Sequence, residues 1–162
     1  MKKTSKLSSS MEDYLEAIAV LKQKNKVARV RDISNLLNVE TPSVTSALGK
    51  LSREGLVIHE RYGYVDLTDK GQELAENVQK RHEILLKFLT GILNIDQATA
   101  AEDACKMEHA ISPETFKRIT KFMDFVDTCP LDDGPDWLKG FDHYFKTGHR
   151  PTCKIRQSKE KS

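Results

Sequence analysis

The chain has 162 residues, of which 38% are hydrophobic and 31% are charged. This composition is typical of a folded protein with one substantial core or two small ones, and it excludes a wholly disordered chain. No apolar run approaches the length of a membrane span, and the basic start MKKTSKLSSS leads into charged sequence rather than a signal-peptide core, so neither a membrane partner nor export is expected.

The distribution of charge is more informative than the small formal total of +2. Residues 1–70 carry twelve Lys and Arg against nine Asp and Glu, a net charge of +3, whereas residues 71–162 carry fourteen against fifteen, a net charge of −1. The positive excess therefore lies in the N-terminal part of the chain. The three cysteines are widely spaced and odd in number, which does not suit a secreted disulfide framework and indicates a cytoplasmic location.

The N-terminal end predicts an arm followed by a helix. Residues 1–10 are small, polar and basic, which is typical of a mobile arm. From residue 11 to about residue 24, apolar residues recur at helical spacing. Ser10, with Asp13 three residues later, resembles a capping start for this helix.

Two helices joined by a turn are predicted next. The first runs over about residues 30–37, with Ile33, Leu36 and Leu37 facing inward. The second has Thr41 as N-cap and Pro42 as its first residue, and it ends near Gly55. One face of this second helix carries small polar side chains and a lysine, which are suited to the major groove of DNA: Ser43, Thr45, Ser46 and Lys50.

A β-hairpin follows Gly55, because the segments LVIHE and YVDLT are short and rich in β-branched or aromatic residues, with Arg61-Tyr62-Gly63 between them. Helix, turn, helix and two-stranded ribbon is the order of a winged helix-turn-helix domain. The polar face and the basic half-domain favour DNA binding over a protein-interaction module. The predicted DNA-binding residues are Arg29, Arg31, Thr41, Pro42, Ser43, Thr45, Ser46, Lys50, Arg61 and Tyr62, although surface solvation explains Arg29 and Arg31 equally well.

Three more helices are predicted after the hairpin. Thr68 can cap a long helix over about residues 69–93, and further helices are expected over residues 96–110 and from Ser112, with Pro113 as first helical residue, to about Val126. Their broad apolar faces indicate a packing and dimerisation domain. Symmetric dimers are the usual way for winged helices to read two half-sites.

The composition changes again after Cys129-Pro130 to Gly, Pro and aromatic residues with little periodicity. Trp137, Leu138, Phe141, Tyr144 and Phe145 predict one amphipathic turn or short helix, and the last ten residues are expected to be disordered. The irregular spacing of Cys129, His143, His149 and Cys153 favours structural packing over a second, zinc-like site, which stays open as an alternative.

The sequence predicts a mainly α fold in three parts. Residues 1–70 form a winged helix-turn-helix DNA-binding domain with a basic N-terminal arm, residues 71–128 form a helical metal-binding and dimerisation domain, and residues 129–162 form a partly disordered C-terminal extension.

Candidate metal ligands occur in three places along the chain. Cys105, Glu108 and His109 share one face of a predicted helix, since positions i, i+3 and i+4 lie on the same side. Asp13 and Glu16 have the same kind of spacing on the first helix, and His82 lies on the long one. Taken one by one, a buried cysteine, a surface histidine or a solvated acid is the more common explanation of such residues.

The sequence resembles the DtxR/MntR family of metal-dependent transcriptional repressors through several blocks in the same order. These blocks cover roughly residues 8–126 and are much more specific together than a helix-turn-helix pattern alone: MEDYLEAI, ARVRDISNLLNVETPSVTSALGKL, YGYVDLTDKG, RHEILLKFL and DACKMEHAISPE. The resemblance implies a winged-helix DNA-binding domain, a helical dimerisation domain and a divalent metal as co-repressor. The chain also ends before an SH3-like third domain of the family would fit, so none is expected.

The resemblance also implies a ligand set. The manganese-sensing branch has ligands at the positions of Asp13, Glu16, His82, Glu108 and His109, all of which match. Cys105 departs from that branch, which has glutamate there, and agrees with the iron-sensing branch, which in turn has methionine at the position of Asp13. The site is therefore a hybrid of the two branches. The ancillary site of the iron branch is largely absent, because Leu86 and Ala101 occupy two of its positions.

The predicted function is a metal-activated repressor, not an enzyme, that binds double-stranded operator DNA as a homodimer and controls metal-homeostasis genes. Carboxylates and imidazole suit Mn²⁺ and Fe²⁺, and a Cys105 thiolate shifts the preference toward Fe²⁺, with Co²⁺ or Zn²⁺ able to bind in vitro. No small-molecule substrate is expected. The alternatives are a winged-helix repressor that senses a small organic ligand and a metalloenzyme; against the enzyme, the chain has no HExxH, Gly-rich phosphate loop or recognisable Ser/His/Asp motif.

Overall fold

A computed structural model describes residues 7–59, 63–130 and 135–151. Helices dominate these residues, which confirms the prediction of a mainly α fold. The chain forms two compact units, which divide between Glu83 and Ile84, within one long helix. The three-part division at residues 70 and 128 stays a prediction.

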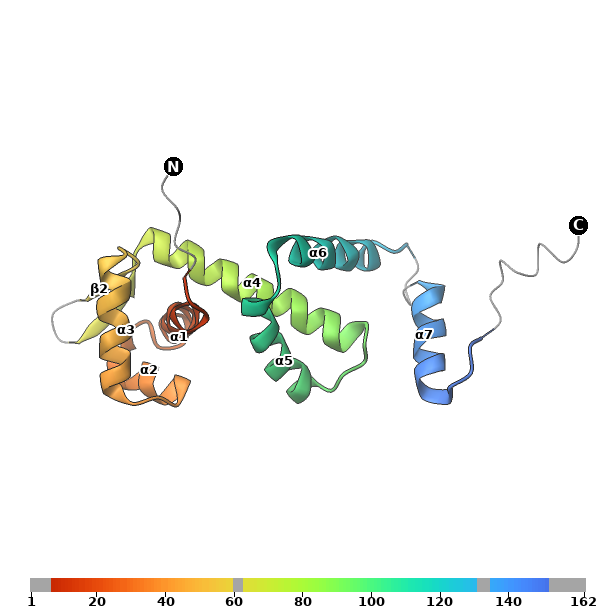
Figure 1. The fold of residues 1–162 in the computed structure, drawn as a ribbon, viewed down its shortest axis with the longest axis horizontal. Helices are drawn as coiled ribbons and strands as arrows, with labels where there is room; N and C mark the ends of the chain where they lie inside the picture. The colour runs from red at the N-terminus through yellow and green to blue at the C-terminus, as the bar shows by residue number, and fades with distance from the viewer. Residues whose placement is uncertain (1–6, 60–62, 131–134, 152–162) are drawn as a thin grey trace, which may run out of the picture. The chain divides into compact units, whose positions relative to one another are not determined.

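The first unit is built from helices α1 (Ser9–Asn25), α2 (Val30–Leu37) and α3 (Thr41–Arg53), strands β1 (Ala28–Arg29), β2 (Val57–His59) and β3 (Tyr64–Leu67), and the first part of α4 (Asp69–Gly91) (Figure 1). Most of the apolar residues that recur along α1 lie in one core with Ile33 of α2 and the buried residues of α3. At its centre lie side chains that are fully or almost fully buried: Leu15, Ile18, Ile33, Val44, Leu48, Leu51 and Leu56.

The three strands form an antiparallel sheet in the order β1-β3-β2. Val57 pairs with Leu67 in the predicted hairpin, and Ala28 pairs with Val65 on the other side of β3. Sequence analysis missed β1, because two residues are too few to show the alternation that marks a strand. The winged helix-turn-helix arrangement is present, and β1 ties the start of α2 to the wing.

The start of α4 packs closely on the turn between α3 and β2. Thr68 caps α4 as predicted, since its hydroxyl accepts a hydrogen bond from the Gly71 amide at 3.1 Å. A Cβ atom at Gly71 would lie 2.0 Å from the Leu56 carbonyl oxygen, so only glycine allows this approach. The turn itself uses Gly55 at φ +69°, where a residue with a side chain is strained.

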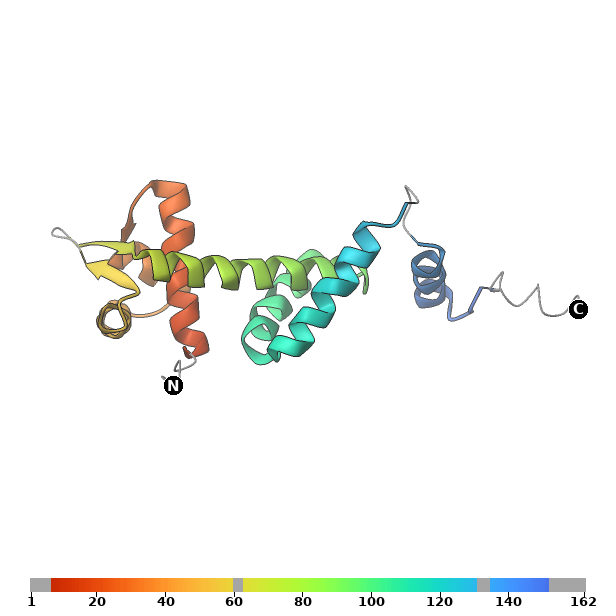
Figure 2. The same cartoon turned by 90° about the horizontal axis from the view of Figure 1, so that it is seen from above.

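The second unit contains the rest of α4 and the helices α5 (Gln97–Ala110), α6 (Pro113–Asp127) and α7 (Asp136–Thr147). Figure 2 shows α5 and α6 beside the second part of α4, and the core between α4 and α5 comprises Leu85, Leu89, Ala100 and Ala104. Helix α6 starts at the cap that the sequence predicted, since the Ser112 side chain accepts from the Thr115 amide. Asp96, predicted as the first residue of the preceding helix, is instead the N-cap of α5, and its side chain accepts from the amides of Ala98 and Thr99.

The aromatic segment after Pro135 forms α7, a helix of twelve residues, so of the two predicted forms, one turn or a short helix, the structure has the helix. Its Trp137 ring lies 5.7 Å from Phe122 of α6, and Phe122 lies 6.2 Å from Phe88 of α4, both measured between ring centroids. The prediction of a mobile arm over residues 1–10 is wrong for Ser9 and Ser10, which belong to α1. Residues 1–6 and the last ten residues, which were predicted to be disordered, lie outside the described residues.

Three local predictions were wrong. The first helix begins at Ser9 with Ser8 as N-cap, because Leu7 and Met11 already pack against the core. Ser10 therefore lies inside the helix. The N-cap of α3 is Glu40 rather than Thr41, so Pro42 is the second helical residue, where its missing N–H is equally harmless. Leu36 does not face inward, since half of its surface is exposed on the outer side of α2.

Candidate metal centre and nucleic-acid interface

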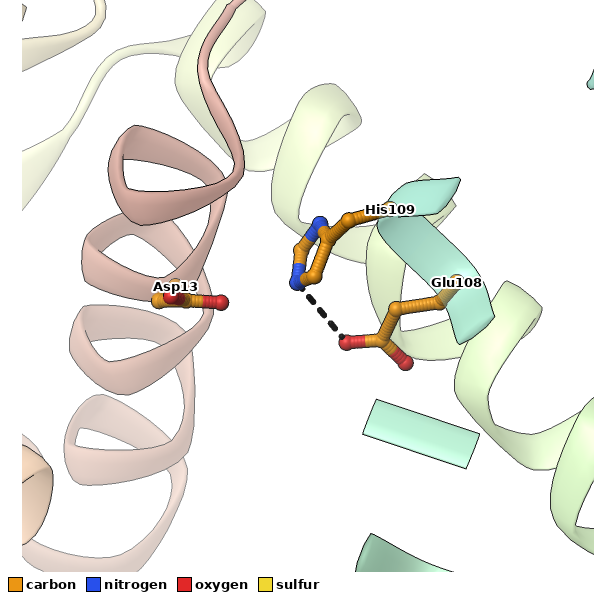
Figure 3. A group of neighbouring side chains, drawn as sticks. All are labelled: Asp13, Glu108 and His109. Atoms are coloured by element: carbon orange, nitrogen blue, oxygen red, sulfur yellow. Dashed lines mark ion pairs between the residues drawn. The ribbon is translucent and has the colours of Figure 1, made fainter. Parts of the chain in front are cut away.

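Helix α5 brings two of the predicted ligands together. Glu108 is completely buried and His109 lies beside it with its side chain 11% exposed, and the carboxylate Oε1 and the imidazole Nε2 are 3.3 Å apart. Figure 3 draws this ion pair on α5, together with Asp13 of α1. One and two turns earlier on the same helix, Ala104 and Ala100 pack in a core with Leu85 and Leu89 of α4.

The chemistry of this pair fits a divalent cation. Burial of an ionised carboxylate is costly unless the charge is compensated, and a carboxylate oxygen beside an imidazole nitrogen is a donor set used for Mn²⁺, Fe²⁺ and Zn²⁺. Glu108 is the one charged residue that is fully buried among the described residues. The pair therefore meets the first requirement of a metal centre.

Cys105 lies one turn before this pair on α5, and its side chain is exposed. Next to it, Lys106 and Glu102 form an exposed ion pair at 2.6 Å across one helical turn. The Lys106 hydrogen bond lowers the pKa of Glu102, and the Glu102 carboxylate raises the pKa of Lys106. Glu102 therefore lies on the exposed face of α5 and is paired there with Lys106, whereas Glu108 lies on the buried face.

The remaining predicted ligands belong to the first unit. Asp13 and Glu16 lie three residues apart on α1, and both are half-buried. His82 lies on α4 and is also half-buried.

An ion pair links these two helices next to the predicted ligands. The carboxylate Oε2 of Glu12 lies 3.3 Å from a guanidinium nitrogen of Arg81, and both side chains are largely buried, at 15% and 24% exposure. Glu12 directly precedes Asp13, and Arg81 directly precedes His82. Sequence reasoning missed this pair, because its members are 69 residues apart and each looks like an ordinary surface charge.

The predicted groove-facing residues Ser43, Thr45, Ser46 and Lys50 of α3 are all exposed, as are the other two predicted DNA-binding residues of this helix, Thr41 and Pro42. Val44, Ala47 and Leu48 between them are buried. The helix therefore presents the polar face that the sequence predicted, and it is held by its apolar face. The Thr45 hydroxyl donates to the Thr41 carbonyl at 3.1 Å, within the helix.

Of the predicted backbone contacts, Arg29 and Arg31 are exposed at the start of α2. Arg61 and Tyr62 lie outside the described residues, as does Cys153 of the alternative tail site.

Comparison with known proteins places these features in a family. The iron dependent repressor, N-terminal DNA binding domain matches residues 6–65, and the iron dependent repressor, metal binding and dimerisation domain matches residues 68–135. An uncharacterised HTH-type transcriptional regulator of Methanocaldococcus jannaschii is 40% identical over 119 residues, which are 73% of this chain and 95% of that protein. The chain belongs to the iron-dependent repressor family.

Two further relatives agree with this iron-dependent repressor assignment. The HTH-type transcriptional regulator MntR of Lysinibacillus sphaericus is 35% identical over 130 residues, which are 80% of this chain and 89% of that protein. The structure of the manganese regulator SloR matches with a TM-score of 0.64 and 31% identity, and the match covers 74% of this chain and 56% of SloR. The chain thus spans just over half the length of that solved structure.

Family membership settles the class of function. The chain is a metal-activated transcriptional repressor with a DNA-binding and a dimerisation domain, and, like its family, it is not an enzyme. No helix among the described residues combines the length and the apolar character needed to cross a membrane.

Proposed function

We propose that this repressor binds double-stranded operator DNA as a homodimer when it is loaded with Fe²⁺, with Mn²⁺ as the alternative ion, and that it controls metal-homeostasis genes in the cytoplasm. The observation that carries the proposal is the buried pair of Glu108 and His109 on α5, inside the part of the chain that matches the family's metal-binding and dimerisation domain. The domain named for metal binding thus contains a donor pair that suits these ions.

The proposed ligands are Asp13 and Glu16 on α1, His82 on α4, and Cys105, Glu108 and His109 on α5. Five of them offer carboxylate or imidazole donors, and Cys105 adds a thiol. A thiolate at Cys105 favours Fe²⁺ over Mn²⁺, because sulfur is the softer donor. Zn²⁺ and Co²⁺ also suit this donor set in vitro, and cellular selectivity then depends on geometry and metal supply.

The proposed mechanism starts from charge. In the absence of metal, the carboxylates of Asp13, Glu16 and Glu108 disfavour any arrangement that gathers them, since like charges repel in a low dielectric. A bound divalent ion supplies the positive charge that removes this penalty. α1 is then restrained together with α4 and α5, and the recognition helices of a dimer are held at the spacing of an operator. To shift the ratio of the DNA-binding state to the inactive state from 1:99 to 99:1, metal must bind the DNA-binding state more tightly by about 5.5 kcal/mol.

We also propose how the DNA is contacted. The exposed face of α3 enters the major groove with Ser43, Thr45, Ser46 and Lys50, and Thr41 and Pro42 at the start of the helix also belong to the interface. Arg29, Arg31, Arg61 and Tyr62 contact the phosphate backbone. Support comes from the exposure of the six α3 residues around a buried apolar stripe.

The test is operator binding measured by fluorescence anisotropy, under anaerobic conditions, with chelator, Fe²⁺ or Mn²⁺. We expect tight binding only with metal, and we expect His109→Ala to lose the metal response while it keeps the fold. His143→Ala, the same substitution at an exposed position of α7, is the matched control and should respond like the wild type. Operator binding that ignores metal, in both the wild type and His109→Ala, would instead favour a repressor that senses an organic ligand.

A further inference from the structure

Arg29 and Tyr64 form a contact that joins the start of the helix-turn-helix to the wing. They are direct partners in the antiparallel pairing of β1 and β3. A guanidinium nitrogen of Arg29 donates to the Tyr64 hydroxyl at 3.2 Å, and the guanidinium carbon lies 5.2 Å from the centroid of the Tyr64 ring. The arginine is exposed and the tyrosine is half-buried.

The tyrosine orients the arginine without neutralising its charge. A neighbouring pair on the same strand shows the contrast: Asp66, two residues further and on the same face of β3, forms an ion pair with Lys22 of α1. The Lys22 cation is thereby compensated by a carboxylate. Arg29 instead has a neutral phenol as partner, so its full charge faces solvent while its side chain is restrained.

The guanidinium retains donors for a second partner. Arginine has five N–H donors in a planar fork, and the hydrogen bond to Tyr64 uses one of them. The hydrogen bond to Tyr64 is also the main cause that raises the pKa of Arg29, with a smaller contribution from Asp32 in the first turn of α2. The side chain is therefore a cation at neutral pH, as arginine is in proteins.

The position of the pair fits a DNA backbone. Arg29 is the N-cap residue of α2, with extended backbone at φ −120° and ψ 151°, and α2 leads directly into the exposed face of α3. Tyr64 is the first residue of β3, directly after Gly63 of the wing. Winged helix-turn-helix proteins contact phosphates with the helix that precedes the recognition helix and with the wing. The pair lies where these two elements are joined by strand pairing.

We propose that Arg29 binds a phosphodiester oxygen of the operator and that Tyr64 is its positioning residue. The proposal rests on the DNA-binding function and adds a residue, Tyr64, that sequence analysis did not select. A restrained arginine loses less side-chain freedom when it binds phosphate, because its planar fork is already oriented. Tyr64 thus strengthens a contact that it does not itself make.

The test uses the full-length, metal-loaded dimer and measures operator affinity as a function of salt concentration. Arg29→Gln should lower the slope of log K against log salt by about one unit for each half-site, since one phosphate contact is lost. Lys22→Gln removes an equal charge from α1, where Lys22 is paired with Asp66 on the same face of β3, and should leave the slope unchanged. An unchanged slope in Arg29→Gln would overturn the phosphate contact, whereas failure of wild type to bind operator would overturn the function itself.

The role of Tyr64 is tested by a double-mutant cycle. Tyr64→Leu should weaken operator binding by roughly two- to fivefold, the factor that corresponds to an exposed cation–π contact, and Tyr64→Phe, which keeps the ring, should lose less. In the Arg29→Gln background, Tyr64→Leu should have no effect on DNA affinity. Equal losses in both backgrounds would show that Tyr64 acts independently of Arg29 and would refute its positioning role. Thermal unfolding of each variant checks the fold, and Tyr64→Phe keeps the cycle informative if the leucine variant unfolds.

Discussion

Glu108→Gln should remove most of the stability that the protein gains from metal. The glutamine keeps the size and shape of the buried side chain but loses the anionic oxygens that suit a divalent ion. At a free metal concentration 100 times the dissociation constant, binding to the folded state alone stabilises a protein by about 2.7 kcal/mol. Substitutions around metal ligands lower metal affinity by up to about 100-fold. With a loss of that size, the stabilisation by metal at the same free concentration falls to about 0.4 kcal/mol.

The assay is urea-induced unfolding of wild type and variant, each with chelator and with Fe²⁺ or Mn²⁺ at the same free concentration. Glu102→Gln is the matched control, because it makes the same change on the same helix where the side chain is 72% exposed and bonded to Lys106. The control should keep the full metal increment of about 2.7 kcal/mol. The reasoning fails if Glu108→Gln gains as much stability from metal as the wild type, or if Glu102→Gln loses as much as Glu108→Gln.

The other predictions concern selectivity, the α1–α4 contact and a helix cap. Cys105→Glu should shift metal-stimulated operator binding toward Mn²⁺, because a hard carboxylate replaces a thiol; an unchanged ratio of Fe²⁺ to Mn²⁺ activation counts against a ligand role for Cys105. Glu12→Gln and Arg81→Gln should each lower the free energy of unfolding by about 1 kcal/mol, because the ion pair between these side chains is largely buried. In a double-mutant cycle the two substitutions should show a positive coupling energy. If their effects are strictly additive, the 3.3 Å contact contributes nothing to stability. The hydrogen bonds from Thr99 lower the pKa of Asp96 below its ordinary value of 3.8. The ionised Asp96 side chain therefore stabilises the fold above pH 3.8, and this stabilisation is lost as the pH falls through the lowered pKa of Asp96 in the folded protein. Asp96→Asn, which caps without ionising, should flatten the acid side of a plot of melting temperature against pH; a curve parallel to that of the wild type would contradict the assignment.

The sequence was sufficient wherever the determining interactions are local. The caps at Thr68 and Ser112 are short-range hydrogen bonds between residues three positions apart, so the residue types alone predict them. Glu108 and His109 are neighbours in the sequence and therefore lie next to each other on one helix. At the start of α3 the residue types predicted Thr41 as the N-cap, but the first backbone hydrogen bonds of the helix are accepted by Glu40.

The tertiary structure decided the features that depend on pairing between distant segments. The contact between Arg29 and Tyr64 joins residues 35 apart, and that between Glu12 and Arg81 joins residues 69 apart. β1 is too short to be visible as a strand until β3 lies beside it. Leu36 fits the helical pattern of an inward residue, yet the core of the first unit leaves it half exposed. A sequence pattern specifies which side chains share a face of one element, but only the packing of that element against others determines what each face meets.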